Sequence, residues 1–175
     1  MHIVSDRGMD LAPEQMDGLD SHLVPLTLTL EGKSYRSGVD IEPDEFYRRL
    51  TATESFPTTS QPSAGDFAEL YRTLAATDPE ILSIHISSGL SGTLNAARAG
   101  AALVPQARVT YVDSKTLSGA QGWQVLAAAQ AARAGWSKEK ILELLQRIGA
   151  LTDTVYTVPS LKYLIHGGRI SHLKG

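Results

Sequence analysis

The sequence contains no cysteine. Disulfide bridges, thiolate zinc sites and a cysteine nucleophile are therefore excluded, and a reducing cytoplasm is the expected compartment. The chain also lacks an excess of positive charge, because 16 basic residues stand against 19 acidic ones for a net charge of -3. No cluster of lysine and arginine of the kind that follows a phosphate backbone is present, so nucleic acid is not an expected partner.

Long hydrophobic runs are missing as well. The segment 1–6 has neither the basic nor the apolar region of a signal peptide, so we expect no export by that route. The longest nearly uncharged stretch, around 117–132, is interrupted by Gln121, Gln124 and Gln130. Because it is too short and too polar to span a bilayer, it is interpreted as a buried, alanine-rich helix.

The sequence predicts strands that alternate with helices along the chain. Phe67, Leu70, Tyr71 and Leu74 recur at the spacing of one helix face, which predicts a helix over 64–76, and the apolar run 81–86 predicts a central strand. Further strands are predicted at 3–4, 26–30, 109–112 and 154–158, further helices at 44–50, 93–103 and 118–134 and around 141–148 and 161–165, and a loop at 51–63. This order favours an α/β fold with a mostly parallel sheet and helices on both faces.

The pattern restarts after residue 149. At 42% apolar residues, 175 residues can bury one core and the beginning of a second. A strand and a helical turn cannot close a core alone. We therefore predict a first α/β domain over 1–150 and, over 151–175, the opening of a second α/β domain whose remainder is missing.

Two loops rich in hydroxyl groups are the most informative feature. Thr59-Ser60-Gln61-Pro62-Ser63-Ala64 precedes a predicted helix, and Ser87-Ser88-Gly89-Leu90-Ser91-Gly92-Thr93 lies between a predicted strand and helix. Unpaired amides and the positive dipole end at a helix N-terminus favour an anion, and hydroxyl groups add donors. Converging loops of this kind predict a site for a carboxylate or a phosphate.

Other interpretations of these residues remain open. Thr59, Ser60 and Ser63 could cap the helix that begins near residue 64, and Ser91 could cap the helix from residue 93. A serine hydrolase is disfavoured, because the sequence Gly89-Leu90-Ser91-Gly92-Thr93 has threonine where the nucleophile elbow needs a second glycine. A phosphate-binding or nucleotide-binding α/β domain involved in phosphotransfer remains the alternative, although neither common glycine-rich nucleotide motif is present.

Several short motifs in order resemble the DegV family of bacterial fatty-acid-binding proteins, some of which are the lipid-carrying subunit of fatty acid kinase. The residues that carry this resemblance are Ser5-Asp6, Val24-Pro25-Leu26, Tyr35 with Gly38-Val39-Asp40-Ile41, Phe46-Tyr47, the two hydroxyl loops, Val112-Asp113-Ser114 and the segment 161–170. The resemblance implies two α/β domains that hold a long-chain fatty acid such as palmitate, and no other cofactor. It also implies a non-catalytic carrier that presents the acid to a separate ATP-using kinase subunit, which makes an acyl phosphate.

By the same resemblance, Thr59 or Ser60 and Ser91 donate to the fatty acid carboxylate, and Arg169 lies near the site. Arg169 could instead hold a domain interface through carbonyl groups. The chain departs from the family pattern where Arg7-Gly8 follows Asp6 in place of Ser or Thr, and where Ser37 stands in place of an Asp. The domain that supplies much of the lipid tunnel, and a histidine near the carboxylate, is absent from these residues.

The remaining polar residues favour structural roles. His85 lies within a buried strand pattern and is interpreted as a hydrogen-bonded core histidine. Asp6 is a ligand-loop residue or a turn former after the first strand, and we favour the turn. The other histidines, His2, His22, His166 and His172, have no metal-binding spacing, so no metal site is predicted.

Overall fold

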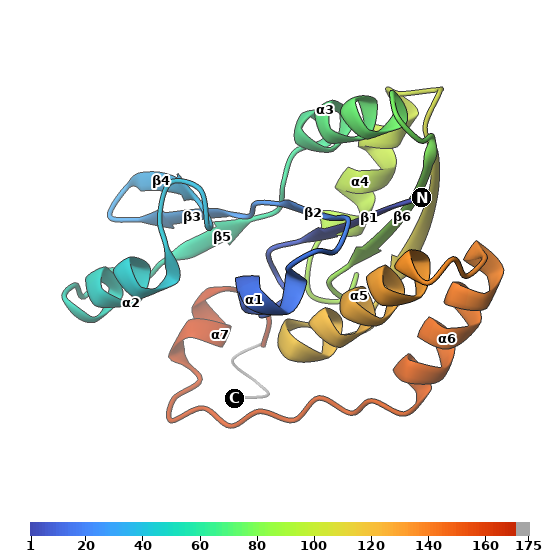
Figure 1. The fold of residues 1–175 in the computed structure, drawn as a ribbon. Helices are drawn as coiled ribbons and strands as arrows, with labels where there is room; N and C mark the ends of the chain where they lie inside the picture. Colours follow the sequence, from blue (N-terminus) through green and yellow to red (C-terminus); the bar gives the residue numbers. More distant parts are fainter. Residues whose placement is uncertain (171–175) are drawn as a thin grey trace. The chain divides into compact units, whose positions relative to one another are not determined.

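The computed structural model describes residues 1–170 (Figure 1). His172 therefore lies outside the described residues. The elements in chain order are β1 (His2–Asp6), α1 (Pro13–Met16), β2 (Ser21–Val24), β3 (Thr27–Leu30), β4 (Lys33–Arg36), α2 (Pro43–Thr51), β5 (Thr58–Ser60), α3 (Ala64–Ala75), β6 (Glu80–His85), α4 (Thr93–Ala102), β7 (Arg108–Asp113), α5 (Ser118–Arg133), α6 (Lys138–Ala150) and α7 (Lys162–His166). In this part of the chain, no helix is both long enough and apolar enough to cross a bilayer.

The chain forms two compact units. The first consists of residues 1–24 and 62–154, and the second of residues 25–61 and the residues from 155 onward. Each unit is therefore described by itself.

The first unit is built on a four-stranded parallel sheet in the order β2-β1-β6-β7. Adjacent side chains of a strand point to opposite faces of a sheet, so Ile3 packs with α5 and α6, while its neighbour Val4 packs with α3 and α4. Leu82 and Ile81 divide in the same way between the two faces. The sheet is thus covered on both sides, which confirms the predicted α/β fold with a mostly parallel sheet.

Helix ends in this unit follow the capping residues. The Ser63 hydroxyl accepts a hydrogen bond from the backbone N–H of Asp66 at 3.1 Å, and the Asp66 carboxylate accepts one from the backbone N–H of Ser63 at 2.7 Å. Gly135 has a φ of 79°, which suits the left-handed end of α5, and the Ser137 hydroxyl caps α6. The two helices predicted over 118–134 and around 141–148 are therefore separate elements, α5 and α6.

The second unit contains a three-stranded antiparallel sheet in the order β4-β3-β5. Glu31 and Gly32 both have positive φ and join Leu30 to Lys33 in a two-residue hairpin. The expectation of an unbroken loop over 51–63 is wrong, since β5 lies within it and pairs with β3. The three residues of β5 are exposed, carry hydroxyl groups and show no apolar alternation. Pairing with β3 therefore decides their conformation.

The strand expected over 154–158 is also wrong, because these residues form neither a helix nor a strand in the structure. Their threonine, valine and tyrosine content favours a strand only where a neighbouring strand and a core are available. Val155 is 86% exposed and Val158 is 44% exposed, so the described residues provide no core for this segment.

Candidate ligand-binding site

Three strands of the first unit end at the same edge of the parallel sheet. The loops that follow β1, β6 and β7 are joined by backbone hydrogen bonds from Ser87 to the carbonyl of Thr116 and from Ser118 to the carbonyl of Gly8, both at 2.8 Å. The backbone N–H of Ser114 also donates to the carbonyl of His85 at 3.0 Å. This edge is where open α/β sheets commonly place a ligand site.

A buried carboxylate holds two of these loops in place. Asp6 is fully buried, and its Oδ1 accepts a hydrogen bond from the backbone N–H of Gly8 at 2.8 Å, which confirms its role in the turn. Its Oδ2 accepts one from the backbone N–H of Ile86 at 3.1 Å and lies 2.9 Å from Nδ1 of His85. Burial raises the pKa of Asp6, but the His85 contact and the two backbone donors outweigh it, so the pKa lies below its usual value.

The same carboxylate is one end of a buried polar chain. Nε2 of His85 lies 2.7 Å from Oγ of Ser83, which lies 2.7 Å from the hydroxyl of Tyr71. The order of Asp6, His85 and Ser83 is that of a serine hydrolase triad. These three residues are fully buried, however, and the Ser83 hydroxyl is shared with Tyr71, so no substrate can reach it in this arrangement. The prediction that His85 is a hydrogen-bonded core histidine is confirmed.

Ser91 lies in the loop between β6 and α4. Its Oγ lies 2.8 Å from Oγ1 of Thr93 and accepts a hydrogen bond from the backbone N–H of Thr93 at 3.3 Å. The carbonyl of Ser87 accepts hydrogen bonds from the backbone N–H groups of Leu90 and Ser91, which closes the turn. Helix α4 has Gly92 as its N-cap, a residue with no side chain to satisfy the first amides. Ser91 thus stands one residue before the cap, with its hydroxyl beside the start of the helix.

A second carboxylate, at the end of β7, orders the other side of this loop. The Ser88 hydroxyl donates to Asp113 at 2.6 Å, and Nζ of Lys115 donates to it at 2.7 Å. Burial raises the pKa of Asp113, but hydrogen bonds from Lys115 and Ser88 lower it to about 2 overall. Asp113 is therefore a negative charge at neutral pH that is already paired, and the Ser88 hydroxyl is committed to it.

The other predicted carboxylate donors belong to the second unit. Thr59 and Ser60 are neighbours on β5, opposite Leu28 and Thr27 respectively. Neighbouring side chains of a strand point to opposite faces, so only one of these two hydroxyl groups can face a given ligand. Both lie outside the α3 cap, which is Ser63. Arg169 is exposed, and its Nη1 donates to the carbonyl of Gly167. The convergence of these residues with Ser91 stays a prediction.

Sequence reasoning missed the role of Gln121. Its Nε2 donates to Ser5 at 3.2 Å and to Asp6 at 3.3 Å, and its fully buried Oε1 has no protein partner among the described residues. Gln124, one turn further along α5, is also buried and donates to the carbonyl of Ser114 at 3.0 Å. The sequence signal for this role was the presence of two glutamines three residues apart on an alanine-rich helix. They interrupt an apolar face because that face meets the polar ends of β1 and β7.

The fold and these loops define an open α/β protein with a polar cluster at the carboxyl edge of its parallel sheet. The chain belongs to the DegV family: the family model described as "Uncharacterised protein, DegV family" matches residues 1–175. The DegV domain-containing protein YejH of Lactococcus lactis is 41% identical over 173 residues, which are 99% of this chain and 62% of that protein.

Solved structures of the family share the fold. A DegV family protein from Thermus thermophilus, described as fatty acid binding, has a TM-score of 0.86 and 37% identity over 96% of this chain and 60% of that one. DegV of Bacillus subtilis, described as a fatty acid binding protein, has a TM-score of 0.88 and 30% identity over 97% of this chain and 61% of that one. The chain thus spans about 60% of the length of these relatives.

Proposed function

We propose that this chain forms part of a protein that binds a long-chain fatty acid. The observation that carries the proposal is the ordered loop at 87–92, which presents the Ser91 hydroxyl beside the start of α4 at the carboxyl edge of the sheet. A helix start of this kind favours a carboxylate. The family relatives described as fatty acid binding support the choice of a fatty acid over other carboxylates.

In this proposal, Ser91 and either Thr59 or Ser60 donate to the carboxylate, and Arg169 lies near it. Palmitate has about fourteen methylenes, and burial of each is worth roughly 0.8 kcal/mol, so the tail could contribute on the order of 11 kcal/mol before binding costs. Hydrogen bonds to a charged head group are worth about 1.5–3 kcal/mol each. The tail therefore dominates the affinity, whereas the hydroxyl groups select acids over neutral lipids.

We further propose that the protein is a non-catalytic carrier. A separate kinase subunit would transfer the γ-phosphoryl group of ATP to the bound carboxylate, giving an acyl phosphate and ADP, and the use of ATP places this reaction in the cytoplasm. The burial of the Asp6, His85 and Ser83 chain agrees with a carrier, since it leaves no accessible serine nucleophile there. Acyl phosphate that forms only when the loaded protein, the kinase subunit and ATP are all present would support this role.

Native mass spectrometry of the purified protein tests fatty acid binding. The expected result is a co-purifying mass equal to that of one long-chain fatty acid per protein. A bound nucleotide would instead favour the phosphotransfer alternative, and a protein that neither retains nor takes up a fatty acid contradicts the proposal.

Ser91→Ala is expected to reduce the preference for palmitate over its methyl ester by about tenfold, because one hydrogen bond to the charged head group is lost. Competition binding with the acid and the ester measures this preference. Ser55→Ala is the matched control, since Ser55 is an exposed serine outside the proposed site. An unchanged preference in Ser91→Ala removes Ser91 from the site.

A further inference from the structure

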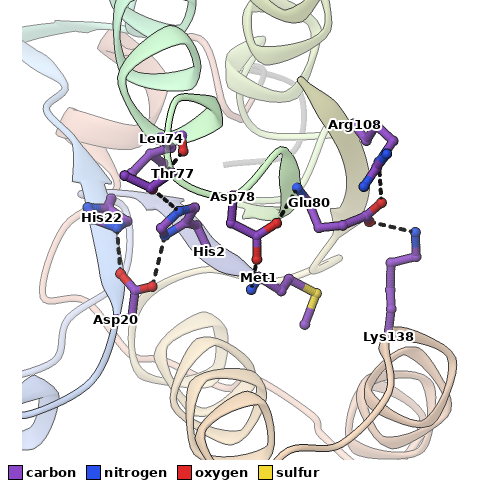
Figure 2. A network of polar contacts seen from close by, with 10 residues as sticks. All are labelled: Met1, His2, Asp20, His22, Leu74, Thr77, Asp78, Glu80, Arg108 and Lys138. Carbon is purple, nitrogen blue, oxygen red and sulfur yellow. Dashed lines mark hydrogen bonds and ion pairs between the residues drawn. The ribbon is translucent and has the colours of Figure 1, made fainter. Parts of the chain in front are cut away.

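Two histidines and an aspartate meet at the β2 edge of the parallel sheet (Figure 2). They lie where β1 and β2 begin, whereas the loop at 87–92 follows the carboxyl end of the parallel strand β6. Nδ1 of His2 lies 2.8 Å from Oδ2 of Asp20, and Nε2 of His22 lies 2.7 Å from Oδ1 of the same carboxylate. The register that pairs Ile3 with Ser21 and Val4 with His22 sets Asp20 beside His2. The three ligand atoms lie within 4.8 Å of one another.

The hydrogen bonds around His2 leave a lone pair that faces the carboxylate. The Thr77 hydroxyl donates to the carbonyl of Leu74 at 2.9 Å, so it accepts from Nε2–H of His2, which lies 3.0 Å away. In the neutral ring, Nδ1 then carries no proton, yet it lies 2.8 Å from a carboxylate oxygen. Two acceptors this close repel each other unless a proton lies between them or both are ligands of one metal ion.

We propose that His2, Asp20 and His22 bind a divalent transition-metal ion of the zinc type. Two imidazoles and one carboxylate are ligands that zinc prefers, and three protein ligands leave at least one coordination position for water. The side chains of His2 and His22 are 13% and 32% exposed, and that of Asp20 is 57% exposed, so the ion has a path from solvent. Thr77 would orient His2 from behind, as outer partners of metal-bound histidines commonly do.

Other charges lie near the cluster without occupying it. Asp78 pairs with the amino terminus, and Arg133 of α5 lines a pocket together with Asp20. A bound ion would tie the edge strand β2 to β1 at the end where both strands begin. The sequence indicated no such site, because the two histidines are far apart in the chain and only the parallel register of β1 and β2 brings them together.

Zinc titration of the metal-free protein by calorimetry, with cobalt(II) absorption as a second readout, tests the proposal. We expect one zinc per chain and a Tm higher by about 5–10 °C when zinc is about 100-fold above its Kd. His22→Gln is expected to weaken zinc binding by at least tenfold, and Thr77→Val by about 10–100-fold. Tetrahedral cobalt ligation would give intense visible bands that both variants weaken.

His166→Ala is the matched control, because His166 is an exposed histidine of the second unit. It should bind zinc with wild-type affinity. Circular dichroism first establishes that each variant is folded. If a variant is unfolded, the zinc titration of the wild-type protein alone tests the proposal. No zinc binding by the wild-type protein, or equal binding by His22→Gln, overturns the proposal, and neither result bears on fatty acid binding.

Discussion

Replacing Asp6 with alanine is expected to lower the free energy of unfolding by about 3–5 kcal/mol. The carboxylate is fully buried and is the acceptor for the backbone N–H groups of Gly8 and Ile86, and it lies against Nδ1 of His85. Its loss leaves these three groups unpaired inside the protein, and unpaired buried polar groups are costly. Urea unfolding at neutral pH measures the change.

The matched control is Asp17→Ala, since Asp17 is exposed and the variant should change the free energy of unfolding by less than about 0.5 kcal/mol. The pH dependence gives an independent check. The pKa of Asp6 is lowered in the folded protein, so its stabilising contribution is present above the unfolded value of about 3.9 and is lost as the pH falls through the lower folded pKa. Asp6→Ala should therefore lose less stability below pH 4 than the wild type does. Equal acid sensitivity would show that Asp6 does not provide this contribution.

Helices and strands whose apolar residues are regularly spaced or continuous were predictable from the sequence. The stripe that includes Phe67 and Tyr71 and the apolar run that includes Ile81 and Ile84 indicated α3 and β6, and all four of these side chains are buried. Long buried segments carry their own signal because burial on one or both faces dictates which positions are apolar. The parallel order of the sheet followed from the alternation of strands with helices.

Short strands at edges were not predictable in the same way. β2 and β4 contain His22 and Lys33 among other polar residues, and β5 contains only hydroxyl residues. Each is an outer strand of its sheet, so its conformation depends on hydrogen bonds to a neighbour rather than on its own apolar pattern. The segment 154–158 is the opposite case, since it has strand-forming residues but no pairing strand within residues 1–170.

The candidate site was predictable as single residues and not as a network. Asp6 could be expected to form a turn and His85 to be buried, but the contact between them joins residues on β1 and β6 that only the sheet order makes adjacent. The pairing of β5 likewise places Thr59 and Ser60 on opposite faces, a choice that the sequence left open. A sequence motif shows which chemical groups are present. Which residues they contact depends on the strand order and pairing of the folded protein.

The close approach of α3 and α4 makes Gly100 the other position with a large expected effect. A Cβ atom added there would lie 2.6 Å from Cβ of Phe67, 2.7 Å from the carbonyl oxygen of Ala64 and 3.0 Å from the backbone nitrogen of Ala68. Two of these three atoms belong to the backbone, so the contact cannot be relieved by a rotamer change. We expect Gly100→Ala to lower the free energy of unfolding by about 2–3 kcal/mol, measured by urea unfolding.

Gly149→Ala is the matched control, because it makes the same substitution in helix α6 where the added methyl meets no described atom within 4 Å. There the gain in helix propensity should raise the free energy of unfolding by about 0.5–1 kcal/mol. The opposite signs separate the packing of α3 against α4 from the general effect of alanine in a helix. If Gly100→Ala is as stable as Gly149→Ala, the two helices do not pack as closely as the structure places them. Since α4 begins at Thr93, two residues after Ser91, Gly100→Ala should in that case also leave the geometry of the loop at 87–92 unchanged.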